Sequence, residues 1–310
     1  MLTAHMPCTQ IHRFTQTIDF SWNDKSPEVR MEFCDDDLTN FEANGATLPA
    51  APETKGYVEH EGAKIWYATF GSGSPVILLH GGFGHSGNWS YQLPDLLAAG
   101  HRVILIDSRG HGRSTRDARP YTYELMASDV LAIMDALHLE RAALVGWSDG
   151  ACIALILADQ APSRIAGAFF FGCNMDPSGL KQINERNPLL HRCLSRHAMD
   201  YAQLSPTPDQ FNEFAHAVRI MMSTQPNYTA QDLSRISVPV IIVQAEHDEF
   251  IKHEHAEYLA STIPNAKLAI LKDVSHFAPL QRPHQFNAAV LAFLTEVLPD
   301  GPTTRGAVTS

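Results

Sequence analysis

A serine flanked by glycines is the residue of this chain best suited to chemistry. Ser148 is the centre of Gly-Trp-Ser-Asp-Gly at 146–150, which fits the pattern G-x-S-x-G. The apolar run Ala-Ala-Leu-Val precedes it, and the helix-like Ala-Cys-Ile-Ala-Leu-Ile-Leu-Ala follows it. A serine in a sharp turn from strand to helix takes strained backbone angles, and its glycines let neighbouring backbone pass without Cβ clashes. The pattern therefore predicts that Ser148 is a nucleophile in such a turn, which is called a nucleophile elbow.

A glycine-rich loop could supply the second element of a reaction centre. The sequence His-Gly-Gly-Phe-Gly at 80–84 follows the short apolar run at 75–79, which is typical of a buried strand. We expect the N–H groups of Gly82 and Asp149 to form an oxyanion hole, with Phe83 as the alternative to Gly82. Their fixed dipoles would replace water around a developing alkoxide.

An acid and a base follow two later apolar runs. The run at 238–245 predicts a strand that delivers Asp248, and the run at 268–271 predicts a strand that leads to His276. The chain has 16 histidines, but only His276 follows the last predicted strand and precedes the last long helix. The order along the chain is then Ser, Asp, His. In such a set Asp248 orients His276, which takes the proton of Ser148.

These motifs make the chain similar to the α/β-hydrolase superfamily. The resemblance covers about residues 57–298 and rests on segments at 80–82, 107–114, 146–150, 245–248 and 275–277. The Gly-Trp-Ser-Asp-Gly elbow and the Asp-Ser-Arg-Gly turn look most like the valacyclovir hydrolase, or biphenyl hydrolase-like, branch and its bacterial relatives. Dehalogenases and epoxide hydrolases have Asp at the centre of the elbow, and proline iminopeptidases have proline at the position of Phe83. The resemblance therefore implies a serine esterase-type hydrolase.

The resemblance leaves three other carboxylates as alternatives for the acid. Glu246 and Glu249 are neighbours of Asp248, and Asp176 follows the preceding strand, from which some superfamily members supply the acid. We favour Asp248 because it lies three residues after Ala245, a position that usually holds glycine in the superfamily.

The implied reaction is cleavage of a carboxylic ester through an acyl-enzyme, on small to medium, partly apolar substrates. The alternative within the fold is a carbon–carbon bond hydrolase of the ring-cleavage-product type, which uses the same three residues. A further alternative is a pseudoenzyme that only binds its ligand, although such a receptor has no need to retain Ser148, Asp248 and His276 together. We expect no organic cofactor and no metal. His253 and His255 stand two positions apart, so they do not share a helix face as metal ligands would.

Composition restricts the partners of the protein. With 310 residues, of which 45% are apolar, the chain can bury one large core. Its formal charge of −11 opposes binding to nucleic acid or to anionic membranes. The expected partner is therefore a small-molecule ester. The sequence does not decide whether the protein forms a homo-oligomer. The five cysteines are odd in number and form no C-x-x-C, which favours a reducing, cytoplasmic location. We also find no apolar signal segment at the start and no run long enough to span a membrane.

The elements that must position these residues alternate in type. Residues 56–60 and 64–70 predict a hairpin, and a helix is predicted between Tyr121 and Leu139. Further strands are predicted at 75–79, 102–107, 142–147, 166–173, 239–245 and 267–272. This alternation is typical of a mostly parallel, doubly wound α/β sheet with right-handed crossovers.

One long interruption predicts an inserted helical cap at 175–237, between core segments at 53–174 and 238–298. An insertion there would lie over the carboxyl ends of the strands, where open α/β sheets bind ligands. The residues that we expect to contact substrate are all aromatic: Phe83, Trp147, Phe211, Phe214 and Phe277. The apolar residues of the cap could equally form its own small core.

The remaining segments carry no motif. Residues 1–52 are expected to be an appendage, partly disordered and not needed for chemistry, and 299–310 to be a tail. We interpret His80, His111 and Arg109 as structural residues of their turns and Cys152 as a small buried residue of the elbow helix.

Overall fold

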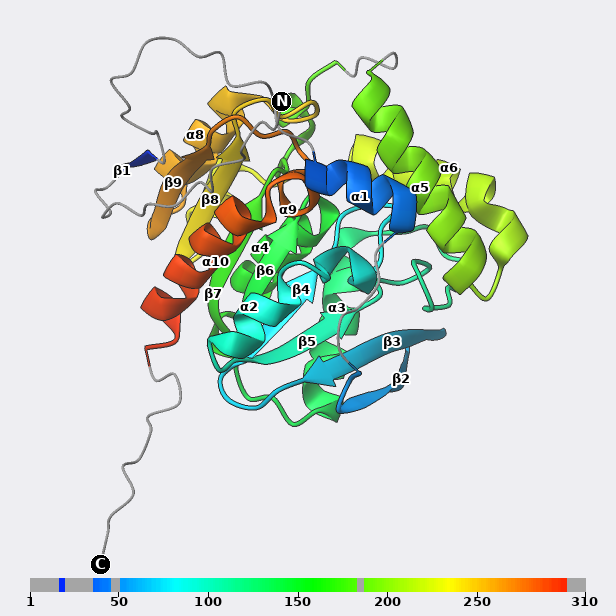
Figure 1. The fold of residues 1–310 in the computed structure, drawn as a ribbon. Coiled ribbons are helices and arrows are strands. Elements are labelled where there is room, and N and C mark those ends of the chain that lie inside the picture. The colour runs from blue at the N-terminus through cyan, green and yellow to red at the C-terminus, as the bar shows by residue number, and fades with distance from the viewer. Residues whose placement is uncertain (1–16, 20–35, 46–50, 183–186, 300–310) are drawn as a thin grey trace, which may run out of the picture.

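A sheet of nine strands forms the centre of the protein (Figure 1). The computed structural model describes residues 17–19, 36–45, 51–182 and 187–299. The strands lie in the order β1-β9-β8-β7-β6-β4-β5-β3-β2. They are β1 (Thr17–Asp19), β2 (Thr54–His60), β3 (Ala63–Phe70), β4 (Pro75–Leu79), β5 (Arg102–Ile106), β6 (Ala142–Trp147), β7 (Ile165–Phe171), β8 (Val240–Ala245) and β9 (Ala266–Leu271). β3 pairs antiparallel with β2 and β5, and every other described pair is parallel.

The predicted fold class is confirmed. The hairpin and the six later strands are all present, and their ends agree with the predicted ones to within a few residues. The central strands β4, β6 and β7 are apolar along nearly their whole length and are buried on both faces, as strands covered by helices on each side must be. This is why continuous apolar runs, without alternation, identified them in the sequence.

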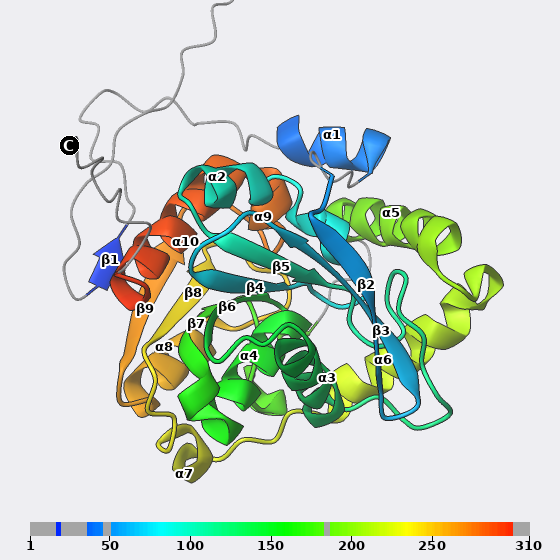
Figure 2. The ribbon, with the colours of Figure 1, turned by 90° about the horizontal axis from the view of Figure 1, so that it is seen from below.

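Helices cover both faces of the sheet (Figure 2). One face carries α3 (Tyr123–Ala136), α4 (Asp149–Gln160) and α8 (His253–Thr262), and the other carries α2 (Leu93–Ala98), α9 (Ala278–Gln281) and α10 (Pro283–Val297). Two buried apolar clusters, one for each face, hold these layers together. In the described ranges, no helix combines the length and apolar character needed to cross a membrane.

Between β7 and β8 the chain leaves the sheet and forms α5 (Pro188–Leu204), α6 (Phe211–Thr224) and α7 (Ala230–Leu233). We call residues 175–237 the helical insertion. Its apolar side chains Tyr201, Phe214, Val218 and Met221 are buried and belong to the same cluster as α3 and α4. The insertion therefore packs directly on the core, and it corresponds to the segment predicted as a cap.

A helix that the sequence analysis did not predict precedes the sheet. Residues Asp36–Asn44 form α1, and Leu38 and Phe41, three positions apart on one face of it, are buried. In addition, β1 pairs in parallel with β9. The sequence does not signal α1, because a single pair of apolar side chains is too weak a periodic pattern to identify a short helix. That segment 1–52 is a partly disordered appendage stays a prediction. Residues 1–16, 20–35 and 46–50 of this segment, and the tail from 300, lie outside the described residues.

Candidate active site

Ser148 lies in a strained turn between β6 and α4. Its backbone angles are φ 54° and ψ −124°, a region that residues with a Cβ atom rarely adopt. The N–H of Ser148 donates to the carbonyl of Phe171 at the end of β7 (2.8 Å), and its own carbonyl accepts from Ala151 (2.7 Å). Hydrogen bonds on both sides thus hold the turn in this conformation.

Close backbone approach explains both glycines of the motif. A Cβ atom on Gly146 would collide with the backbone of Gly150 and Ala151, and one on Gly150 would collide with the carbonyl of Leu79 at the end of β4. The first turn of α4 can therefore lie directly against two strands only because neither position carries a side chain.

Asp248 and His276 form a buried pair. The Nδ1–H of His276 donates to Oδ2 of Asp248 at 3.0 Å, while Oδ1 of Asp248 accepts from the backbone N–H groups of Phe250 and Ile251, both at 2.9 Å. Burial by itself raises the pKa of Asp248, but the charge and hydrogen bond of His276 and the two backbone donors outweigh it and lower the pKa. Asp248 is thus an ionised partner that holds one ring nitrogen of His276.

The backbone of His276 is fixed from two sides. Trp147 Nε1 donates to its carbonyl (2.9 Å), and its N–H donates to Oε2 of Glu249 (3.0 Å). Burial lowers the pKa of His276, but the charge of Asp248 and its hydrogen bond, with Glu249 and Asp149 farther away, raise it above its usual value. A Cβ atom on Gly172 would lie 3.1 Å from Nδ1 of His276. The ring therefore reaches the end of β7, where Phe171 holds Ser148.

The competing carboxylates have other partners. Oε2 of Glu246 accepts from the backbone of Asp273 (3.0 Å). Oδ1 of Asp176 accepts from the backbone of Ser178 (2.9 Å), and its Oδ2 lies 3.8 Å from Nδ1 of His255. Glu249 contacts the backbone of His276 rather than its ring. Of these four carboxylates, Asp248 is the one that accepts a hydrogen bond from the His276 imidazole.

The glycine-rich loop after β4 abuts the serine. A Cβ atom on Gly81 would lie 3.1 Å from Cβ of Ser148, and Gly84 N–H closes the turn onto the carbonyl of Gly81 (3.2 Å). Phe83 has a positive φ of 64°. As the first residue of α4, Asp149 has an N–H without an acceptor inside the helix. The two predicted sources of oxyanion donors thus flank the serine.

The side chain of Asp149 is a further feature of the site, in addition to the N–H predicted as an oxyanion donor. Oδ1 accepts from the hydroxyl of Tyr123 (2.8 Å), whereas Oδ2 has no hydrogen-bond partner within the described part of the chain. A Cβ atom on Gly82 would lie 2.7 Å from this oxygen and would also collide with Met222 of α6. Gly82 and Met222 therefore lie beside the oxygen. Burial raises the pKa of Asp149 to about 6, against the opposing effects of Tyr123 and His276. No pattern in the sequence signals this, because Tyr123 lies in a different helix.

The five aromatic residues predicted to contact substrate occupy two different places. Phe83, Phe211 and Phe214 lie where the helical insertion meets the loop after β4, with ring centroids of Phe83 and Phe214 6.2 Å apart. Trp147 and Phe277 pack on each other and on His276 in the cluster on the opposite face of the sheet. The structure does not bring all five together, and their contact with substrate stays a prediction.

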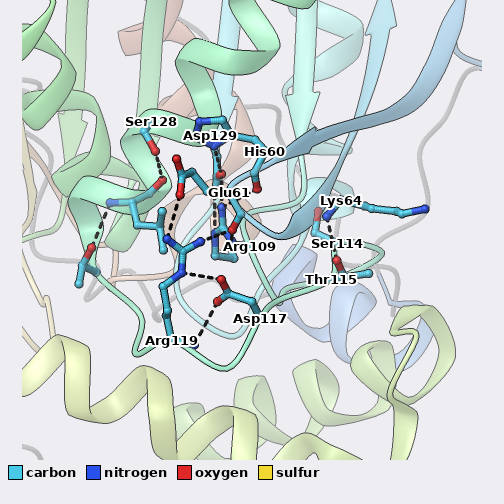
Figure 3. A network of polar contacts seen from close by, with 12 residues as sticks. His60, Glu61, Lys64, Arg109, Ser114, Thr115, Asp117, Arg119, Ser128 and Asp129 are labelled. Atoms are coloured by element: carbon cyan, nitrogen blue, oxygen red, sulfur yellow. Dashed lines mark hydrogen bonds and ion pairs between the residues drawn. The ribbon is translucent and has the colours of Figure 1, made fainter.

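Arg109 belongs to a network of polar contacts with Asp129 and Glu61 (Figure 3). Its guanidinium donates twice to the buried carboxylate of Asp129, at 2.9 and 2.6 Å, and also to the carbonyl of Glu61. His111 Nδ1 donates to the carbonyl of Arg109, and His80 Nε2 accepts from the backbone of Ser108 (3.0 Å). These contacts join the turn after β5 to the β2–β3 hairpin and to α3, which is the arrangement expected of structural residues.

Cys152 is fully buried on α4. Its Sγ lies 2.7 Å from Sγ of Cys173, and it also donates to the carbonyl of Asn174 at 3.1 Å. Burial raises the pKa of the Cys152 thiol well above its usual value. A thiol that stays protonated is a poor nucleophile, in agreement with its interpretation as a packing residue.

Comparisons with known proteins identify the family. Residues 74–191 match the family described as alpha/beta hydrolase fold. RutD of Azorhizobium caulinodans, named as a candidate carbamate hydrolase, is 29% identical over 78% of this chain and 98% of its own. The human serine hydrolase BPHL is 26% identical over 78% of this chain and 86% of its own. The solved structure of Est816, described as an N-acyl homoserine lactone degrading enzyme, has 28% identity and a TM-score of 0.65, and the match covers 77% of this chain and all of Est816.

These matches agree with the strand order, with the strained serine after β6 and with the pair of Asp248 and His276 after the last strands. The protein is therefore a hydrolase of the α/β-hydrolase superfamily.

Proposed function

We propose that this hydrolase cleaves carboxylic esters through an acyl-enzyme, with Ser148 as nucleophile, His276 as base and Asp248 as the acid that orients it. The observation that carries the proposal is the end of β7. Phe171 there accepts the N–H of Ser148, and the next residue, Gly172, packs against the ring of His276 while Asp248 occupies Nδ1. Nε2 of His276 is thereby left as the ring nitrogen that can take a proton.

The reaction would proceed in two stages. His276 removes the hydroxyl proton of Ser148 as its oxygen attacks the ester carbonyl, and it then returns the proton to the leaving alcohol. Water, deprotonated by the same imidazole, attacks the acyl-enzyme and releases the acid. The N–H groups of Asp149 and Gly82 stabilise the oxyanion in both stages, with Phe83 as the alternative to Gly82.

The relatives support the choice of reaction. The name of RutD refers to carbamates and that of Est816 to a lactone, which is a cyclic ester. Both substrates carry an acyl carbon bonded to oxygen, which a serine can attack. Ester hydrolysis is the simplest reaction of this type that the residues around Ser148 could perform.

The aromatic and thioether groups of the insertion support a partly apolar substrate. Phe211 and Met222 are half-buried, and Met222 lies against Gly82 beside the proposed oxyanion donors. Apolar area buried there would contribute about 25 cal/mol per Å² to binding. Small to medium acyl or alkyl groups are therefore the proposed substrates.

Labelling with a fluorophosphonate tests the nucleophile. Native protein should incorporate one probe, located by mass spectrometry on the peptide that contains Ser148, and Ser148→Ala should lose both the label and hydrolysis of p-nitrophenyl esters. Ser234→Ala, an exposed serine on the insertion, is the matched control and should label fully. Full labelling of Ser148→Ala would assign the nucleophile elsewhere.

A further inference from the structure

Helix α1 joins two parts of the molecule that are far apart in the sequence. Its buried side chains Leu38 and Phe41 belong to one apolar cluster with Leu190 and Cys193 of α5 and with Leu280 of α9. Figures 1 and 2 both show α1 lying beside α5, and Figure 1 also shows α9 at its other end. Because α9 begins two residues after His276, α1 connects the helical insertion to the loop of the proposed base.

Polar contacts fix α1 to the same two partners. Arg192 of α5 donates to Glu42 at 2.6 Å and to the hydroxyl of Thr39 at 3.1 Å. On the core side, Asn40 donates to the hydroxyl of Tyr91 at 2.8 Å. The helix is thus held by apolar burial in its centre and by hydrogen bonds to the insertion on one side and to the core on the other.

The end of α1 covers a buried ion pair within α5. A Cβ atom on Gly45 would lie 2.6 to 2.9 Å from the guanidinium of Arg196, so the backbone of Gly45 lies directly against this group. Arg196 in turn donates from Nε to Oδ1 of Asp200 at 2.8 Å, and both side chains are almost fully buried. Gly45 thus packs against the Arg196 end of this buried pair.

The other oxygen of Asp200 faces the loop of the proposed oxyanion hole. Its Oδ2 lies 3.4 Å from Nε2 of His85, which stands two residues after Phe83. His85 caps the following helical turn: its Nδ1 accepts from Gly87 (3.0 Å) and its N–H donates to Asn88 (2.8 Å). Asp200 therefore contacts the residue that ends the loop at 80–85.

We propose that α1 is a strap that holds α5 against the core and that Arg196 and Asp200 are positioning residues, which act through His85 on the loop at 80–85. Its catalytic consequence rests on the proposed function, since this loop is the proposed source of an oxyanion donor. Helix α1 is then part of the working enzyme, contrary to the expectation that segment 1–52 is not needed for chemistry.

Hydrogen–deuterium exchange on the full-length Phe41→Ala protein tests the strap independently of any activity. Amides of α5 should exchange at least tenfold faster than in the native protein, while those of β6 and α4 stay unchanged. Met199→Ala is the matched control, because Met199 lies on α5 and is 54% exposed. It should change exchange neither in α5 nor in β6 and α4. Faster exchange confined to α1 would overturn the proposal, because α5 would then be held without it.

A charge exchange tests the same contact without removing buried volume. Glu42→Arg places two cations together and should speed exchange in α5 by up to roughly fivefold, the upper end of the range for an exposed ion pair. Glu42→Arg combined with Arg192→Glu should restore the native rate to within about twofold. Failure of the double variant to restore it would overturn the direct contact, even if Phe41→Ala proved too unstable to study.

Steady-state kinetics of Asp200→Asn tests the positioning role. A displaced oxyanion donor acts on the transition state more than on bound substrate, so kcat for p-nitrophenyl acetate and butyrate should fall roughly ten- to a hundredfold with KM nearly unchanged. Arg196→Lys should retain more of kcat than Arg196→Met. Equal loss of kcat and thermal stability in both Arg196 variants would indicate a merely structural pair and overturn this role.

The outcomes separate the two proposals. If Ser148 is not the nucleophile, Ser148→Ala keeps its fluorophosphonate label, but exchange in α5 still responds to Phe41→Ala. If the strap is wrong, Ser148→Ala is inactive while exchange in α5 is unaffected by either change in α1.

Discussion

At the scale of single residues, two buried carboxyl groups of the candidate active site, Asp248 and Asp149, have opposite pKa shifts. Oδ1 of Asp248 accepts two backbone N–H groups and its Oδ2 one from His276, so its charged form is stabilised and its pKa is lowered. Asp149 has a single donor, Tyr123, and its pKa is raised to about 6 because burial dominates. Environments that separate the pKa values of two acids in this way are common in active sites.

Asp248→Asn should lower kcat by about 10⁴-fold, because an amide no longer stabilises the charged imidazolium or selects the correct tautomer. Hydrolysis of p-nitrophenyl butyrate measures the effect. Asp176→Asn is the control, since Asp176 pairs with His255 instead, and it should stay within a few-fold of native activity. If Asp176→Asn lowered kcat more than Asp248→Asn, the catalytic acid would be Asp176.

Asp149→Asn should stabilise the protein above pH 6. The folded state favours the neutral acid, so the group's stabilising contribution is complete below its unfolded pKa of 3.8 and is lost as pH rises through about 6. The shift corresponds to about 3 kcal/mol of destabilisation by ionisation at pH 8, which asparagine avoids. Urea unfolding at pH 8 and pH 4 should show a gain at pH 8 alone, and exposed Asp209→Asn should show none. An equal gain at both pH values would contradict the shift.

At the scale of elements, two side chains of α6 have different surroundings and different expected roles. Phe214 is 1% exposed and contacts Tyr201 and His111 with ring centroids at 4.7 Å in each case, so it joins the insertion to the core. Met222 is half-buried and lies over Gly82 beside Asp149. Both residues are on α6, but we expect Phe214 to contribute to the stability of the fold and Met222 to affect which substrate binds.

Phe214→Ala should lower the free energy of unfolding by about 3–5 kcal/mol, the usual cost of removing a buried aromatic ring. Met222→Ala should leave stability nearly unchanged and raise KM for p-nitrophenyl octanoate more than for the acetate. Phe211→Ala should behave like Met222→Ala if its half-buried ring contacts substrate. Equal KM changes for both esters would assign these side chains to the insertion's own packing.

At the scale of the whole molecule, the sheet brings segments from distant parts of the chain to one edge. The loop after β4, the turn after β6 and the loops after β8 and β9 all follow the carboxyl ends of parallel strands. Parallel order places these ends on the same side, where open α/β sheets bind ligands. Met222 of the helical insertion lies against the loop after β4 at this edge, and α1 in turn contacts α5 of the insertion.

The amino-acid sequence by itself determined strands β2 to β9, the elbow and the order of Ser148, Asp248 and His276. These features depend on neighbours in the chain: an apolar run forms a buried strand, and Gly146 and Gly150 permit the turn between β6 and α4. Such local signals need no knowledge of the remaining fold. The hydrolase family follows from the same motifs.

The tertiary structure alone decided which side chains meet and what charge they carry. Asp149 has its raised pKa because α3, α6 and the loop after β4 exclude water from it, and desolvation is a sum over residues remote in the sequence. His85 and Asp200 are separated by 115 positions, and Arg192 lies 150 positions from Glu42. Neither contact has a periodic or spacing signal, because each side chain would suit a solvated surface equally well until packing buries it.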